Sequence, residues 1–233
     1  MTSAVVPFSI DSGLFAINGT AGQATVKIHN TNTGKIIHST LTTENGESSA
    51  RGGFEVDGVS GEAARIQLDF LNPAGSRTGK LLPTGSKIDE FDGIRTSCID
   101  VGNPCCFVQA EEMGVDGGYT PDQIEQHPDL LRRLDSIRRQ AGVKMGLASC
   151  PGEVPGSVPK ICVVSPSDDS SNVDLRLRAI SVGQPHKAVP ITVALSTTAA
   201  SKLAGTVVQE CVSPTMVDPA GVTLGHASGT LMV

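Results

Sequence analysis

The stretch IDVGNPCCFV, residues 99–108, carries the clearest structural signal in this chain. Apolar residues flank Gly102-Asn103-Pro104 on both sides, which predicts a strand, a sharp break and a second strand. Adjacent residues of a strand point to opposite faces, so Cys105 and Cys106 should neither bond to each other nor share a metal ion. Cys98 lies on the preceding strand with no candidate base beside it. We expect these cysteines to pack as small hydrophobic residues.

The break itself is more informative than the cysteines. The amide of Asn103 offers two N–H donors and one carbonyl acceptor, so a broken strand could point it at a ligand carboxylate. The same three residues are also typical of an ordinary turn. The local sequence leaves both interpretations open.

Composition excludes several classes of protein. With 26 Gly, 14 Pro and 18% charged residues among 233, the chain should form many short strands around a buried core. It has no Trp, one Tyr and a net charge of −6, which argues against a nucleic-acid partner. No apolar run is long enough to span a bilayer, so we expect no membrane partner.

The cysteines and histidines indicate a reduced protein without metal. The six cysteines show no C-x-x-C spacing, and the N-terminus has no basic region typical of a secretory signal. We therefore expect free thiols and a cytoplasmic location. No spacing of His, Cys and carboxylates resembles a metal site, and no phosphate-binding or dinucleotide motif occurs.

Periodicity divides the chain into β-rich and helical parts. Strands are expected over residues 24–29, 35–43, 64–71, 159–165 and 173–180. A capping box at Thr120–Gln123 begins a helical region, and an apolar stripe runs over residues 130–141. The loop-rich segment 72–93 is the candidate domain boundary.

Two apolar segments predict buried helices. PHKAVPITVALSTTAASKLAG, residues 185–205, has no charge between Lys187 and Lys202. Its apolar residues surround the helical circumference, which is typical of a buried helix. SAVVPFSIDSG, residues 3–13, is a shorter version of the same pattern. One such helix in each half indicates two similar subdomains.

Two further loops contain candidate binding residues. His186 follows Gly183-Gln184-Pro185 at the start of the second buried helix, where it could bind a carboxylate, handle a proton or serve as a loop or capping residue. GHASG, residues 225–229, could bring backbone N–H groups close to an anion or form a tight β-turn.

Several blocks, in this order along the chain, resemble the PrpF family of 2-methylaconitate cis-trans isomerases, and most closely its fungal members. The resembling blocks are MTSAVVPFSIDSGLF (1–15), GKLLPTG (79–85), IDVGNPCCFV (99–108), VKMGLA (143–148), PKICVV (159–164), DLRLRAISVGQPHKAVPITVAL (174–195), GTVV (205–208) and GHASGTLMV (225–233).

The resemblance implies an α+β, diaminopimelate-epimerase-like fold. Two similar domains would each wrap a mainly antiparallel sheet around a central buried helix: residues 1–92 as the remainder of an incomplete first domain, and residues 93–233 as the second. It also implies Asn103 as the leading substrate-binding residue, with His186, His226, Ser228 and Gly229 beside it.

The implied activity is isomerisation of unsaturated tricarboxylates, of the aconitate or methylaconitate type, by proton transfer at carbon without a cofactor. In the family a cysteine of a G-N-C-G-N motif and an upstream lysine form the catalytic pair. In the family both residues stand before the position that corresponds to Met1, so we expect no catalytic residue in this chain. The alternative is an inactive, truncated member that binds carboxylates or associates with itself, including as a homodimer.

Overall fold

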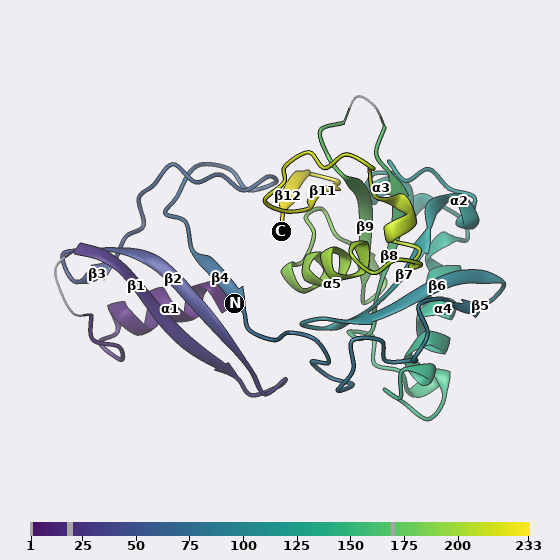
Figure 1. Ribbon diagram of the computed structural model, residues 1–233, viewed down its shortest axis with the longest axis horizontal. Coiled ribbons are helices and arrows are strands. Elements are labelled where there is room, and N and C mark those ends of the chain that lie inside the picture. Colours follow the sequence, from purple (N-terminus) through teal and green to yellow (C-terminus); the bar gives the residue numbers. More distant parts are fainter. Residues whose placement is uncertain (1, 18–20, 169–170) are drawn as a thin grey trace. The chain divides into compact units, whose positions relative to one another are not determined.

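The structure, a computed structural model, describes residues 2–17, 21–168 and 171–233. It divides into two compact units, Met1–Pro73 and Ala74–Val233 (Figure 1). Both units combine β-sheet with helix, which confirms the predicted α+β class. No helix in the described ranges is long and apolar enough to cross a membrane.

The first unit is a four-stranded antiparallel sheet with one helix. Its elements are α1 (Thr2–Asp11), β1 (Ala21–Asn30), β2 (Lys35–Glu44), β3 (Glu47–Ser48) and β4 (Gln67–Phe70). β2 is central: it pairs with β1 along its whole length and with β3 and β4 at its other edge. Asn45 and Gly46 have φ values of 54° and 81° and form a tight turn between β2 and β3, a conformation that an Asn-Gly pair favours.

Helix α1 is less buried than the sequence predicts. Val6 and Ile10 pack with Leu41 of β2 in a small core. Val5 and Phe8, by contrast, are 45% and 66% exposed. The helix is less buried because the described strands of this unit cover only one of its sides.

The second unit is built around an eight-stranded mixed sheet in the order β12-β11-β9-β8-β7-β6-β5, with β10 beside β9. Its strands are β5 (Asp89–Phe91), β6 (Ile94–Asp100), β7 (Pro104–Gln109), β8 (Lys160–Pro166), β9 (Leu175–Ser181), β10 (Gln184–Pro185), β11 (Thr223–His226) and β12 (Gly229–Met232). Two pairs, β7–β8 and β9–β11, are parallel, and the others are antiparallel.

Helices cover both faces of this sheet. They are α2 (Ala110–Met113), α3 (Pro121–Gln126), α4 (Leu130–Lys144), α5 (Ile191–Ser201) and two short 3₁₀ turns, η1 (Pro151–Glu153) and η2 (Gln209–Cys211). α5 packs on one face and α4 on the other (Figure 1). Strands buried on both faces read as continuous apolar runs, which explains the composition of IDVGNPCCFV.

Alternation along β7 confirms the prediction for the cysteines. Cys105 and Phe107 point into the core that contains α5. Cys106 points into the core that contains α4, as does Cys98, its partner in register on β6. The two neighbouring thiols are therefore separated by the sheet itself.

The predicted helices of this unit are also present. Thr120 and Gln123 form a reciprocal capping box at the start of α3. The apolar stripe of α4 is buried through Leu134 and Ile137, among others. Pro190 is the N-cap of α5, directly before its first turn.

Residues 74–92 pack with the second unit. β5 pairs with β6, and the backbone N–H of Gly75 donates to the carbonyl of Asp100 at 2.8 Å. The boundary between two related domains at residues 92 and 93 remains a prediction, because a division into compact units does not test whether the units are related.

Candidate functional site

Asn103 lies in the short connection between β6 and β7. Gly102 before it has a φ of 71°, and a Cβ there would lie 3.4 Å from Cγ2 of Thr192 in the first turn of α5. The positive φ favours glycine here, whereas at that distance a Cβ would make only an ordinary van der Waals contact with the helix. The hydroxyl of Ser196 in α5 donates to the backbone carbonyls of Val101 at 2.9 Å and Asn103 at 3.2 Å.

This anchoring leaves the side chain of Asn103 available. Asn103 is half-buried, and its amide forms no hydrogen bond with the described residues. The backbone is thus held by α5 while both amide donors remain unused. Such an amide is suited to binding a carboxylate.

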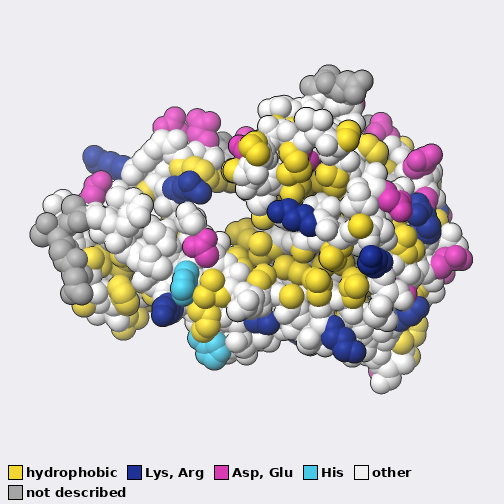
Figure 2. All heavy atoms as spheres, in the orientation of Figure 1, with side chains coloured by type: hydrophobic (Ala, Val, Ile, Leu, Met, Phe, Trp, Pro, Cys, Tyr) yellow, Lys and Arg dark blue, Asp and Glu magenta, His cyan; other side chains and the backbone are white. Residues whose placement is uncertain are grey.

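The N-terminus of α5 adds two donors beside this connection. Val193 and Ala194 donate their backbone N–H groups to the carbonyl of Pro190, but Ile191 and Thr192 find no acceptor among the described residues. Unpaired N–H groups at the start of a helix attract anions. Figure 2 shows hydrophobic side chains over this helix, where Ile191 is 48% exposed, so a bound anion would have an apolar neighbour.

His186 is fixed between β10 and α5. Its backbone N–H donates to the carbonyl of Ala179 at 2.8 Å. Its Nε2 atom is buried and has no partner in the described part of the chain. Burial lowers the pKa of His186 below its ordinary 6.5, and the positive charge of Lys160 lowers it further. The imidazole is therefore neutral at physiological pH.

Lys160 is the residue at this site that sequence reasoning missed. It begins β8, and its Nζ donates to Oγ of Ser181 at 3.1 Å. Strand alternation places it on the face of Cys162, which is the α5 face, and its charge acts on the thiols of Cys105 and Cys162. Within the described ranges it forms no ion pair with a carboxylate. A lone lysine at the start of PKICVV was the available signal.

The GHASG segment forms the turn between β11 and β12. The backbone N–H and hydroxyl of Ser228 donate to the carbonyl of Lys187, next to His186, at 3.1 and 3.0 Å. The N–H of Ser228 also lies 3.2 Å from Nδ1 of His226. Ser228 therefore holds the loop before α5, and its hydroxyl is already engaged.

His226 and Gly229 also line a cavity of about 220 Å³, together with Arg176 and Arg178 of β9. These arginines alternate along the strand with leucines that face α5. His226, by contrast, is two residues after Leu224 of β11, which packs in the core with α5, and its Nδ1 accepts from the N–H of Ser228. The structure thus places Asn103, His186 and Ser228 near α5, with His226 bonded to Ser228 and bordering the arginine cavity with Gly229.

The buried cysteines do not have the properties of a nucleophile. All six are free, and five are buried. Burial raises the pKa of Cys105 to about 12 and raises that of Cys98 further. Cys98 also lies in the α4 core, away from α5. In the described ranges, no group of three or more His, Cys, Asp or Glu residues could hold a metal ion.

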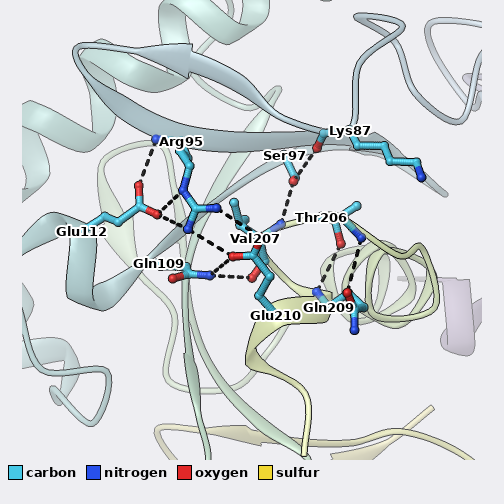
Figure 3. Close-up of polar contacts among 10 residues, drawn as sticks. Lys87, Arg95, Ser97, Gln109, Glu112, Thr206, Val207, Gln209 and Glu210 are labelled. Atoms are coloured by element: carbon cyan, nitrogen blue, oxygen red, sulfur yellow. Dashed lines mark hydrogen bonds and ion pairs between the residues drawn. The ribbon is translucent and has the colours of Figure 1, made fainter.

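A second cavity, of about 570 Å³, lies where β7 and β8 end, and its charge is wrong for a carboxylate. Its ionisable lining includes Glu111, Asp116 and Glu210. Arg95 pairs with Glu210 at 3.1 Å and with Glu112 at 2.6 Å, and Gln109 also donates to Glu210 (Figure 3). This network is satisfied internally and ties β6 and β7 to η2. A negative lining would repel an anionic ligand.

Comparisons with known proteins agree with this picture. The family model described as PrpF protein matches residues 1–233. A putative isomerase, YbhH, of Escherichia coli (strain K12) is 36% identical over all of this chain, which spans 64% of that relative. The 2-methyl-aconitate isomerase of Shewanella oneidensis is 32% identical, and the chain again spans 64% of its length.

A solved structure, the crystal structure of methylitaconate-delta-isomerase, superposes with a TM-score of 0.85 at 34% identity. It covers 100% of this chain, which spans 64% of the solved one. The fold is accordingly diaminopimelate-epimerase-like, as the resemblance implied. The relatives named above are bacterial, and the fungal affinity remains a prediction. The match to the family model over every residue shows that this chain belongs to the PrpF family.

Proposed function

We propose that this chain forms the carboxylate-binding part of an isomerase that acts on unsaturated tricarboxylates of the aconitate or methylaconitate type. The observation that carries the proposal is the junction between the Gly102-Asn103 turn and α5. There a free amide and two unpaired helix N–H groups lie together on a partly apolar surface. The name of one relative, which refers to 2-methyl-aconitate, supports this substrate class, and the name of the solved structure refers to methylitaconate, an unsaturated dicarboxylate.

The chemistry is proton transfer at carbon without a cofactor. A hydrogen beside a double bond and flanked by carboxylates is acidic, and its removal gives a delocalised anion. Donors fixed at the carboxylates stabilise the negative charge that develops on their oxygens. Return of the proton to another carbon, or after rotation, gives the isomer. The role we assign to Asn103 and α5 is to hold the carboxylate on which that charge accumulates.

The described residues include no evident base for this reaction. The pKa of every buried cysteine is raised, so these thiols do not ionise near neutral pH. We assign the neutral imidazole of His186 to hydrogen bonding with a carboxylate, not to proton transfer. We therefore expect the 233-residue chain alone to bind ligand without turnover. The alternative function, a carboxylate-binding or self-associating protein without any catalytic role, shares this expectation.

A proton NMR experiment in D₂O tests the proposal. The purified chain is incubated separately with cis-aconitate and trans-aconitate, and binding is followed by saturation transfer from protein to ligand. We expect binding with no isomer interconversion and no deuterium uptake. Absence of binding by a folded chain would contradict the carboxylate site. Deuterium uptake would show that the chain carries its own base, and isomer interconversion would show that it is catalytic.

The same experiment on a longer protein separates the two candidate functions. In a chain extended to the full length of its relatives, the isomerase proposal predicts interconversion of the isomers. The alternative predicts binding alone.

The free cysteines support placing the protein in a reducing compartment such as the cytoplasm.

A further inference from the structure

Lys160 is a cation without a carboxylate partner in the described ranges, and it lies on the face of the sheet that carries α5. Of its three ammonium donors, one is used by the hydroxyl of Ser181. A partly buried ammonium group gains little from a single neutral acceptor, because it gives up hydration without charge compensation. Two donors and a full positive charge therefore remain for an anion.

His186 provides an independent observation at the same place. Its Nε2 is buried and unpartnered, which is costly for a polar atom unless a ligand completes its hydrogen bonding. Burial and, to a smaller extent, the nearby ammonium of Lys160 disfavour the imidazolium form, so the ring stays neutral with one N–H to donate. When that hydrogen is on Nε2, the ring donates to a carboxylate oxygen.

These two groups stand beside the Asn103 junction, not within it. Cys105, two residues after Asn103, is in register with Lys160 on the neighbouring strand, and Lys160 in turn approaches Ser181 near the end of β9. A ligand with one carboxylate at the amide of Asn103 could therefore place another toward Lys160. The pair of sites would favour polycarboxylates over monocarboxylates.

We infer that Lys160 and His186 form a second anchor, which binds a further carboxylate of the ligand held by Asn103 and α5. This inference rests on the proposed function and deepens it by naming the residues that bind a second carboxylate of the ligand. Lys160 is a binding residue that selects for the second negative charge.

The test compares trans-aconitate, which has three carboxylates, with crotonate, an unsaturated monocarboxylate. Dissociation constants are measured by NMR titration for the wild-type chain, Lys160→Met, Lys160→Arg and the control Lys202→Met. Lys202 is exposed and lies at the C-terminal end of α5. Thermal melting confirms that each variant folds.

We expect Lys160→Met to weaken trans-aconitate binding about tenfold or more, the typical effect of losing a charge-assisted hydrogen bond. Crotonate binding should be unchanged, Lys160→Arg should restore much of the loss, and Lys202→Met should behave as wild type. In the wild-type chain, trans-aconitate should also shift the ring signals of His186, a readout that needs no variant.

The outcomes separate this inference from the function on which it rests. If the wild-type chain binds neither acid, both fail. If it binds trans-aconitate but Lys160→Met binds it equally well, only the second anchor fails. Equal losses for both acids would assign Lys160 a structural role, and unmoved His186 signals at saturating trans-aconitate would also overturn the inference.

Discussion

At the scale of single residues, Asn103 contributes to the fold through its backbone and is available for binding through its side chain. Its backbone carbonyl accepts from Ser196, whereas its side chain has no partner within the described ranges. Truncation should therefore remove a ligand donor and leave the fold intact.

Asn103→Ala should weaken trans-aconitate binding by about tenfold, from the loss of a hydrogen bond to a charged group. Its free energy of unfolding should change by less than about 0.5 kcal/mol, the usual range for a side chain without a structural partner. NMR titration and urea denaturation measure the two quantities. Asn32→Ala, in an exposed turn of the first unit, is the matched control. Unchanged affinity in Asn103→Ala would remove this residue from the site.

The buried imidazole of His186 predicts that the stability of the chain depends on pH. Burial lowers its pKa in the folded state, so below the ordinary value of 6.5 the unfolded chain binds more protons. The stability that the neutral ring contributes is complete above pH 6.5 and is lost as the pH falls toward the folded-state pKa. Urea denaturation between pH 5 and 8 should show this decline in the wild type and a flatter profile in His186→Gln. Identical profiles would contradict a buried neutral imidazole.

At the scale of elements, one hydroxyl joins α5 to the broken strand. Ser196 is fully buried and donates to two carbonyls of the connection between β6 and β7. Thr197, also fully buried, donates to Val193 within its own helix. The two residues therefore form a matched pair, one across elements and one within an element.

Ser196→Ala should lower the free energy of unfolding by about 1–3 kcal/mol, because buried carbonyls lose their donor. It should also weaken ligand binding, since the turn that holds Asn103 is released from the helix. Thr197→Val should leave binding unchanged. Calorimetry and NMR titration check both effects, and equal binding by Ser196→Ala and the wild type would show that α5 does not position the turn.

Local sequence patterns predicted the type and position of each element better than they predicted which elements lie beside it. The opposite faces of Cys105 and Cys106, the capping box at Thr120 and the helix after Pro190 all follow from residues close in sequence. Lys160 was missed because its importance depends on the pairing of β8 with β7 and β9, which no local pattern contains.

The GHASG segment shows the same limit. The tight turn is present between β11 and β12, as one of its two interpretations proposed. Which side chains of the turn point toward α5 depends on the parallel pairing of β11 with β9, a contact distant in sequence. Family resemblance grouped His226 with Asn103; in the structure His226 accepts a hydrogen bond from Ser228 and also borders the cavity that contains Arg178.

At the scale of the whole molecule, the two units differ in how fully they bury apolar surface. The second unit has two extensive cores, one on each face of its sheet. The first has a small core around Val6, Ile10 and Leu41. Phe8 on the outer side of α1 is 66% exposed, and large exposed apolar side chains favour association.

We propose that this surface supports a homodimer. Sedimentation velocity should show self-association that increases with protein concentration and decreases in Phe8→Asp. Val182→Asp is the matched control, because Val182 is 67% exposed but belongs to the second unit. A chain that stays monomeric at all concentrations would contradict the homodimer, and equal effects of both variants would exclude α1 as the contact.

In the function we propose, carboxylates bind where the Gly102-Asn103 turn meets α5. A ¹H–¹⁵N correlation spectrum of the wild-type chain titrated with trans-aconitate measures this binding most directly. We expect chemical-shift changes to concentrate at Gly102, Asn103, Lys160, His186 and the first turn of α5, and the signals of the acidic cavity around Glu210 to stay unchanged. Shifts centred on Glu210, or no shifts at saturating ligand, would contradict this proposal.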